Sequence, residues 1–227
     1  ICLYKIIYMT DIHSHLIPGV DDGAQTFEDS FAMIKAAQDA GVKHIVCTPH
    51  VRDPYFNYDL MRKAFELLQS KVPQREMRLS LGWEVNIEKL LDIGLDWANT
   101  LSPGGKLLLE FPHGCHNHEV RRYCLYIRQF IDRGIRVIIA HPERYATFQR
   151  HSTLAGELAK LGCEFQISSD FLVCGRFGGK TKDTAIRMLK ARQCRYIGSD
   201  AHIPEHYELF AKAQKKYSKY LKKARRS

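Results

Sequence analysis

Several features that mark other classes of protein are absent from this chain of 227 residues. No apolar run approaches the roughly 20 residues that a membrane-spanning helix needs, and residues 1–9 are too short and too poorly flanked for a secretory signal. The chain contains no internal repeat and no low-complexity linker that would mark a domain boundary. These absences favour a single folded domain over residues 1–227, which is long enough to bury a substantial core.

The cysteines lack the spacing of a disulfide framework. Seven are scattered along the chain, and no two of them form a Cys-x-x-Cys motif. This usage is typical of reduced thiols in the core of a cytoplasmic protein. A cysteine phosphatase needs a thiolate held in a phosphate-binding loop, and we expect none of the seven thiols to serve as a nucleophile.

Acidic residues are missing from the C-terminal segment. No Asp or Glu follows Glu208, whereas eight Lys and Arg residues lie between Lys212 and Arg226. The net charge of +9 therefore arises almost entirely from the C-terminal segment. Because the rest of the chain has no basic stripe, we expect no nucleic-acid partner. We expect a basic C-terminal helix or tail over about residues 204–227 with a solvated face. The alternative is weak contact with an acidic partner or an anionic membrane surface.

What is present is an alternation of strand and helix patterns. Amphipathic stretches such as 26–41 and 118–134 separate short apolar or β-branched runs. Thr26 is a candidate N-cap, with Asp29 in the first turn of the helix that follows. Seven runs have the pattern of strands: 6–12, 44–48, 77–83, 106–111, 136–140, 164–168 and 195–199.

Seven strand–helix units imply parallel strands, and the economical arrangement is a single-domain α/β fold that closes, or nearly closes, into a barrel. The alternative is an open doubly wound sheet. No Gly-x-Gly-x-x-Gly follows the first strand, which weakens the dinucleotide-binding form of that alternative. In a parallel barrel the carboxyl ends of the strands meet at one face, where catalytic groups collect.

The first strand ends in side chains that bind metals. His13 and His15 are two residues apart, so they face the same side of an extended strand. A loop rich in proline and glycine follows, and it allows Asp21 and Asp22 to fold back toward the strand end. Imidazole nitrogens and carboxylate oxygens are the ligands of zinc, manganese and iron. Taken alone, such a motif fits a solvated turn equally well.

Polar residues also end the later apolar runs. They are His50, Glu84, Glu110, His141, Asp200 and His202. One such residue is more often a hydrogen-bonded structural group than a ligand, but so many on one face are not explained in that way. Their carboxylates, together with Asp11 and Asp22, would repel one another unless cations compensate. The pattern therefore predicts a multinuclear metal site. We expect His113, His116 and His118 to form a polar loop, with metal binding as the alternative.

These residues resemble a known family. The motifs DIHSH, TPH, GWE, AHPER and GSDAH, in this order, resemble the polymerase and histidinol phosphatase (PHP) superfamily. More closely, DIHSHLIPGVDDG, LLLEFP, AHPERY and GRFGGK resemble its manganese-dependent bacterial protein-tyrosine phosphatase branch, the CpsB and YwqE type linked to capsular or exopolysaccharide synthesis. The resemblance runs from about Thr10 to His202.

The resemblance implies a fold and a substrate. The fold is a distorted (β/α)7 TIM-like barrel with three divalent metal ions, most often manganese, with iron or zinc as alternatives. The substrate is a phosphotyrosine protein, in particular a membrane-associated bacterial tyrosine kinase. By position, the first ion would be held by His13, His15, Glu84 and Asp200. Glu84 would bridge to a second ion, also held by Glu110 and His141. The third ion would be held by Asp22, His50 and His202.

The resemblance also assigns substrate contacts. Arg144 matches the arginine that grips the substrate phosphate in this branch. Relatives commonly carry a further arginine shortly after the SDAH motif, whereas this chain has Ile-Pro-Glu-His at residues 203–206. His206, Arg176 or Lys180 would have to substitute for that arginine.

The predicted chemistry is hydrolysis of a phosphate ester. Divalent cations lower the pKa of coordinated water and offset charge on the phosphoryl oxygens, and a guanidinium can hold two of those oxygens. A phenolate leaving group, with a pKa of about 10, needs little help from a general acid. The alternatives are a small-molecule phosphatase such as histidinol phosphatase, a DNA exonuclease, and a metal-stabilised module that docks a kinase without catalysis. The full ligand set with Arg144 argues against the last.

Overall fold

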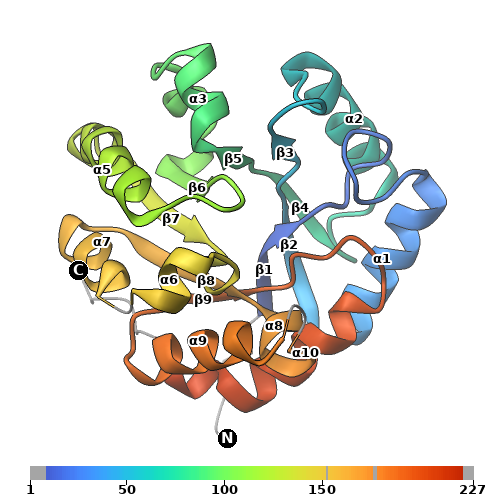
Figure 1. Cartoon of the computed structure of the whole chain (residues 1–227). Coiled ribbons are helices and arrows are strands. Elements are labelled where there is room, and N and C mark those ends of the chain that lie inside the picture. Colours follow the sequence, from blue (N-terminus) through green and yellow to red (C-terminus); the bar gives the residue numbers. More distant parts are fainter. Residues whose placement is uncertain (1–8, 152, 176–177, 222–227) are drawn as a thin grey trace, which may run out of the picture.

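The computed structural model describes residues 9–151, 153–175 and 178–221. In this part of the chain, strands lie at the centre and helices surround them as an outer ring (Figure 1). The strands are β1 (Met9–Ser14), β2 (Val42–Cys47), β3 (His50–Val51), β4 (Arg78–Leu81), β5 (Glu84–Asn86), β6 (Lys106–Glu110), β7 (Arg136–Ala140), β8 (Glu164–Ser168) and β9 (Tyr196–Gly198). They pair in parallel in two sheets, of order β1-β2-β4 and β3-β5-β6-β7-β8-β9.

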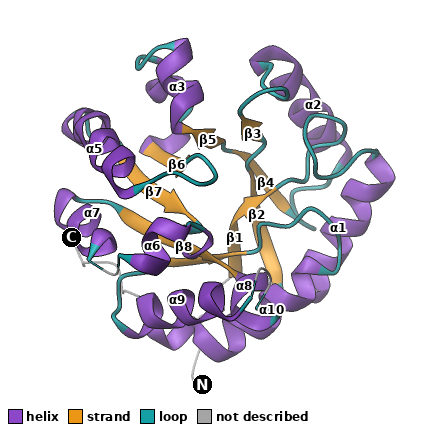
Figure 2. Cartoon of the chain, viewed as in Figure 1, coloured by secondary structure: helices purple, strands orange, loops and turns teal. Residues whose placement is uncertain are grey.

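The parallel α/β architecture expected from the sequence is confirmed (Figure 2). The strand count differs, because β3 and β5 span only two and three residues and are too short to show a periodic pattern. A bridge between Ser14 and Ala201 links the two sheets. Closure into a complete seven-stranded barrel stays a prediction, and residues 6–8 of the first expected strand lie outside the described residues.

Ten α-helices connect the strands in the described part of the chain. They are α1 (Phe27–Asp39), α2 (Tyr58–Lys71), α3 (Ile87–Ile93), α4 (Trp97–Thr100), α5 (Asn117–Asp132), α6 (Ala146–Arg150), α7 (Leu154–Leu161), α8 (Ser169–Val173), α9 (Gly179–Lys190) and α10 (His206–Tyr217). The predicted cap of α1 is confirmed: the Thr26 hydroxyl accepts from Asp29 N at 3.1 Å, and the Asp29 carboxylate accepts from Thr26 N at 2.9 Å. None of the described helices is both long and apolar enough to cross a membrane.

Alternate residues of the central strands pack on opposite sides. On β6, Leu107 and Leu109 are fully buried in the main core, which includes residues of the surrounding helices. Leu108 faces the other way and forms a small separate cluster with Ile138 and Ala140 of β7. This alternation follows from the two-residue repeat of an extended strand. The central strands therefore have one side in the large core and the other in a smaller, separate cluster.

The basic C-terminal segment forms α10 in the described residues. Tyr207 and Phe210 are fully buried in the main core. Lys212, Lys215 and Lys216 are exposed, as expected for a solvated face. Residues 222–227 of the expected tail lie outside the described residues.

Candidate metal centre

The two histidines of the first motif direct their Nε2 atoms into one space. His13 in β1 and His15 just after it are almost completely buried, with their Nε2 atoms 3.2 Å apart. His13 Nδ1 lies 3.0 Å from Gln166 Oε1, and His15 Nδ1 lies 2.9 Å from Asp21 Oδ2. Because each Nδ1 faces an oxygen acceptor, each neutral ring has its Nε2 lone pair directed at the shared space. Two such lone pairs cannot bond to each other, whereas a cation satisfies both.

Glu84, at the start of β5, lies at the centre of the cluster. Its Oε1 atom is 2.7 Å from His141 Nε2. Its Oε2 atom is 2.8 Å from His50 Nδ1 and 3.3 Å from His13 Nε2. The two oxygens of one carboxylate therefore face different histidines. This arrangement suits a carboxylate that would bridge two cations.

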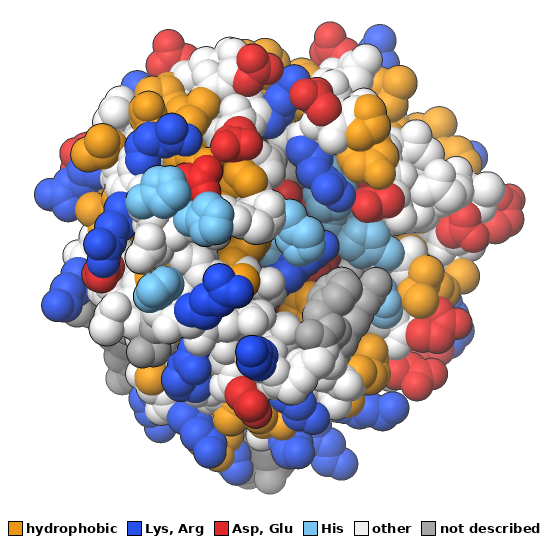
Figure 3. Space-filling view, in the orientation of Figure 1, with side chains coloured by type: hydrophobic (Ala, Val, Ile, Leu, Met, Phe, Trp, Pro, Cys, Tyr) orange, Lys and Arg blue, Asp and Glu red, His pale blue; other side chains and the backbone are white. Residues whose placement is uncertain are grey.

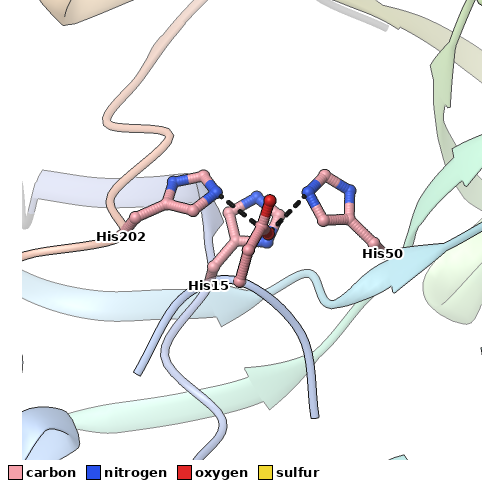
Figure 4. Close-up of side chains that lie close together, drawn as sticks. His15, His50 and His202 are labelled. Carbon is pink, nitrogen blue, oxygen red and sulfur yellow. Dashed lines mark ion pairs between the residues drawn. The ribbon is translucent and has the colours of Figure 1, made fainter. Parts of the chain in front are cut away.

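Asp22 lies between two histidines at the outer edge. Asp22 Oδ1 is 3.1 Å from His50 Nε2 and 3.4 Å from His202 Nε2. Figure 4 shows the rings of His15, His50 and His202 turned toward one another around these ion pairs. The Asp22 side chain is 41% exposed, so this edge is open to solvent. Histidine side chains reach the surface of the same face, with Lys and Arg side chains beside them (Figure 3).

All nine residues predicted as ligands belong to groups whose candidate ligand atoms lie within 4.8 Å of one another. The groups are His15 with Asp22, His50 and His202; His13 with His15 and Asp200; His13 with Glu84 and His141; and His50 with Glu84 and Glu110. Because the groups share members, they form one continuous cluster, which we call the metal centre. The structure brings the nine together, and their division among ions remains a proposal.

The buried part of the metal centre fits divalent cations. Four buried atoms make no hydrogen bond of suitable geometry among the described residues: His50 Nδ1, Glu84 Oε2, Glu110 Oε2 and His141 Nδ1. The first two lie 2.8 Å apart without the alignment of a hydrogen bond. Buried polar atoms in native proteins almost always have a partner. Burial, and then the charge of Glu84, raise the pKa of the Glu110 carboxyl. Cations at these atoms would supply the missing partners and offset the repulsion between the two carboxylates.

Protonation of the histidines leads to the same conclusion. Burial lowers the pKa of His13, but the carboxylates of Glu84 and Asp200 outweigh burial and raise this pKa to about 9. The cluster thus attracts positive charge strongly enough to hold a proton on a buried imidazole. A metal ion binds the deprotonated ring and replaces that proton.

Two predicted ligands have unusual backbone conformations. His141, which follows β7, has φ 32°, and Asp200, just after β9, has φ 52°. Such left-handed conformations of residues other than glycine cost roughly 1–3 kcal/mol each. They occur here at two ends of strands and turn both side chains into the metal centre.

A pocket of about 350 Å³ opens beside the metal centre. Its wall includes the predicted ligands Asp22, His50, Asp200 and His202 and the basic residues Arg52, Arg144 and His206. Lys180 is exposed and does not line this pocket, and Arg176 lies outside the described residues. Of the three candidates for the missing arginine, only His206 is thus placed at the pocket by the described structure.

Residues 9–224 match the family model for capsular polysaccharide synthesis, CpsB/CapC. The chain belongs to this family. The resemblance predicted from the motifs is therefore confirmed.

Relatives in the CpsB/CapC family match most of the chain. Tyrosine-protein phosphatase YwqE of Bacillus subtilis (strain 168) is 31% identical over 202 residues, covering 86% of this chain and 77% of the relative. Putative tyrosine-protein phosphatase CapC of Staphylococcus aureus is 28% identical over 201 residues, with the same two coverages. One similar solved structure comes from work on YwqE of B. subtilis and CpsB of Streptococcus pneumoniae, which are described as metal-dependent tyrosine phosphatases. It matches with a TM-score of 0.79 and 27% sequence identity, and the match covers 93% of this chain and 89% of the chain in that structure.

Sequence reasoning missed Arg52 in this member of the CpsB/CapC family. Arg52 Nη2 lies 3.2 Å from Asp22 Oδ2 and 3.0 Å from His50 Nε2. The sequence does contain a feature that could have indicated Arg52. It follows His50 by two residues, and this spacing places both side chains on the same side of an extended chain. Sequence reasoning also missed Gln166, which orients His13 from a distant strand and carries no local motif.

Asp11 and the loop of His116 and His118 differ in what the structure shows. Asp11 was expected in the repelling group of carboxylates, and this was wrong: its oxygens accept from Ser199 N at 2.9 Å and from Ser199 Oγ at 2.6 Å. Asp11 therefore ties β1 to the end of β9. His116 and His118 stack on each other and belong to none of the candidate metal groups of the described residues, and the expectation of a polar loop without metal stays a prediction.

Cys115 and Arg121 have the Cys-x5-Arg spacing of cysteine phosphatases, which our sequence expectation overlooked. In the structure, α5 begins between them at Asn117, and Arg121 pairs with Glu157 at 3.1 Å. Burial raises the pKa of the Cys115 thiol to about 12. The segment therefore lacks the features that a cysteine phosphatase needs, and the expectation of no cysteine nucleophile stays a prediction.

Proposed function

We propose that this protein is a metal-dependent hydrolase of phosphotyrosine in proteins. The observation that carries the proposal is the pocket beside the metal centre, because it places candidate cation ligands and two guanidinium groups, Arg52 and Arg144, around one space. Phosphate esters are anions that both kinds of group bind well. The relatives named as tyrosine-protein phosphatases support phenyl phosphate esters as the substrate class.

The metal centre would hold three divalent ions, with manganese as the preferred metal and iron or zinc as alternatives. The first ion would be held by His13, His15, Glu84 and Asp200. The second ion would be held by Glu84, Glu110 and His141. The third ion would be held by Asp22, His50 and His202. When bound, the ions supply hydrolytic chemistry by lowering the pKa of water and offsetting phosphoryl charge.

Arg144 would hold the phosphoryl group. It follows His141 by three residues in the turn Pro142–Arg144, so ligand and guanidinium are placed by the same short segment. Burial lowers the pKa of Arg144, but the carboxylates of Asp200 and Glu110 outweigh burial and raise it, so the group stays charged. A planar guanidinium binds two phosphoryl oxygens at once.

Arg52 and His206 would together replace the arginine that relatives carry after the SDAH motif. Arg52 approaches Asp22 and His50 from just after β3, and His206 approaches His202 from the start of α10. His206 Nδ1 accepts a hydrogen bond from His202 N at 3.2 Å. A neutral His206 ring therefore carries its proton on Nε2, from which it can donate to a phosphoryl oxygen.

The proposal extends to the biological setting. Its substrate is a phosphotyrosine protein, specifically a membrane-associated bacterial tyrosine kinase of capsular or exopolysaccharide synthesis, and the family description supports this setting. A cytoplasmic location, a single domain over residues 1–227, and weak contact of the basic C-terminal segment with an anionic membrane belong to the same proposal. The buried main core supports the single domain, since it includes residues from Leu16 to Tyr217.

Activity on three substrates tests the proposal. A phosphotyrosine peptide, histidinol phosphate and single-stranded DNA should be compared side by side with manganese. We expect the peptide to be hydrolysed most efficiently and the activity to vanish with a chelator. A preference for histidinol phosphate would replace the proposal with a small-molecule phosphatase. Failure on all three with metal bound would favour a module without catalysis.

A further inference from the structure

A second cavity lies at the opposite ends of the strands from the metal centre. It has a volume of about 360 Å³. His44, Arg78, Lys106 and Tyr196 line it from the first residues of their strands or close to them, whereas the predicted metal ligands lie mostly at or after strand ends. The volume falls in the range of about 300–1,000 Å³ that is typical of small-molecule sites. We call this space the basal cavity.

The sequence of β4 and its following turn explains why this space is hollow. Parallel barrels normally fill their interior with bulky branched side chains. Here the wall has Ser80 and Gly82 instead, and Ile12 and Val46 remain partly exposed inside. A Cβ atom at Gly82 would lie 2.7 Å from Val46 Cγ1, so the glycine is needed for the close approach of the chain at this point.

The wall of the basal cavity is apolar. Val46, Leu108, Ile138 and Trp83 line it, and the last three are at most 6% exposed. Trp83 is fixed in place by stacking on Tyr58, with 5.3 Å between ring centroids. A ligand with an apolar body would therefore meet a rigid apolar wall.

The mouth of the basal cavity is positively charged. Arg78 and Lys106 are both exposed there, and neither has an ion-pair partner within the described ranges. Farther along the sheet the situation differs, because Arg136 of β7 and Arg195, just before β9, both pair with Glu164 of β8. Two uncompensated cations above an apolar wall suit an anionic head on an apolar body.

His44 adds a polar but uncharged group beside Arg78. It is opposite Arg78 in the β2–β4 ladder, and its Nε2 lies 2.8 Å from Ser80 Oγ. Burial lowers the pKa of His44, and the charges of Arg78 and Lys106 lower it further. The positive charge at the mouth therefore rests on Arg78 and Lys106.

We propose that the basal cavity binds a small amphipathic anion, an apolar chain or ring that carries one carboxylate or phosphate-like head. The apolar body would lie against Val46, Leu108 and Trp83, and the head would lie between Arg78 and Lys106. Residues 1–8 precede β1 and contain one lysine and no acidic residue. This segment therefore lacks the negative charge that would complement the mouth of the basal cavity. A separate anionic ligand complements the mouth better than residues 1–8 do.

Calorimetric titration of the full chain tests this site. The probes are octanoate, octylphosphonate and uncharged octanol, which share the chain and differ in the head. We expect saturable binding of at least one anion, at least about tenfold tighter than octanol. Trp83 fluorescence should change with the same midpoint in a Trp97→Phe background, since the chain has two tryptophans. The anion that binds more tightly shows whether the site prefers a carboxylate or a phosphonate head group.

Matched variants locate the binding. Arg78→Met combined with Lys106→Met removes both charges from an exposed rim, and we expect about tenfold weaker binding or more. Lys43→Met is the control, because Lys43 is exposed on β2 next to His44 and does not line the cavity. No saturable binding, equal affinity for octanol, or equal loss in the control would overturn the proposal. These measurements do not involve phosphatase activity. They therefore test the basal cavity independently of the proposed function.

Discussion

His50 and Glu84 lie opposite each other in register on β3 and β5, and His50 Nδ1 is 2.8 Å from Glu84 Oε2. The other Glu84 oxygen is 2.7 Å from His141 Nε2, beyond the end of β7. One buried carboxylate thus connects three segments that each end or begin at the metal centre. Changing this residue should affect the whole centre and not a single ligand position.

Glu84→Gln should lower both metal content and activity. The substitution keeps the shape of the side chain and removes the charge that would bridge two ions. We expect three divalent ions per wild-type chain after manganese reconstitution, fewer in the variant, and a loss of at least about 100-fold in kcat/KM. Elemental analysis and kinetics measure both. Glu66→Gln, on the exposed side of α2, is the control. Wild-type protein without bound metal after reconstitution would contradict the metal centre.

Arg144→Ala should lower activity without loss of metal. Removal of a donor that stabilises transition-state charge costs roughly 2–4 kcal/mol, and we expect kcat/KM on a phosphotyrosine peptide to fall accordingly. His141→Ala should differ by lowering metal content as well. If Arg144 contributed only an ion pair near the surface, its removal would cost at most about 1 kcal/mol. A decrease of kcat/KM by less than about fivefold would therefore show that Arg144 does not hold the phosphoryl group.

Arg52→Ala and His206→Ala test the replacement of the missing arginine. Hydrogen bonds to charged groups contribute roughly 1.5–3 kcal/mol, and Arg52 carries a full charge. We expect a larger loss of kcat/KM for Arg52→Ala than for His206→Ala, measured on the same phosphotyrosine peptide. Arg62→Ala serves as a control on the exposed face of α2. Unchanged kinetics in both variants would leave phosphate binding to Arg144 and the ions alone.

Cys115→Ser should leave phosphatase activity within about twofold of wild type. Burial raises the pKa of this thiol to about 12, so little thiolate exists near pH 8. Alkylation of the intact protein should accordingly be slow at pH 8 at this position and accelerate as the pH rises toward 12. Mass spectrometry of the modified chain measures the rate. Loss of activity in the serine variant with normal metal content would restore the thiol mechanism.

Thr26→Ala should destabilise the fold by about 1 kcal/mol, the usual cost of losing an N-cap hydroxyl. The Thr26 side chain accepts from Asp29 N, and this bond is lost while α1 keeps its other contacts. Urea unfolding measures the change. Thr26→Ser keeps the hydroxyl and should stay close to wild type. Equal destabilisation by both substitutions would show that the hydroxyl does not contribute.

The sequence determined the parallel α/β class, the cap at Thr26 and the nine candidate ligands that the structure brings into one cluster, and their binding of metal stays a prediction. Each of these depends on local chemistry. Strand residues two apart share a side, and the ends of parallel strands share a face, so His13 and Asp200 could be placed on one face without coordinates. The same local reasoning failed for Asp11, because its partner Ser199 follows β9, far away in the sequence.

Tertiary structure alone decided how those residues face one another. The central position of Glu84 depends on the register of β3 and β5, which are too short to be recognised as strands in the sequence. The orientation of His13 depends on Gln166, and the place of Arg52 depends on Asp22 and His50. The basal cavity likewise exists only once β2, β4, β6 and β7 are assembled. Contacts between residues far apart in the chain are set by packing and register, and no local pattern contains that information.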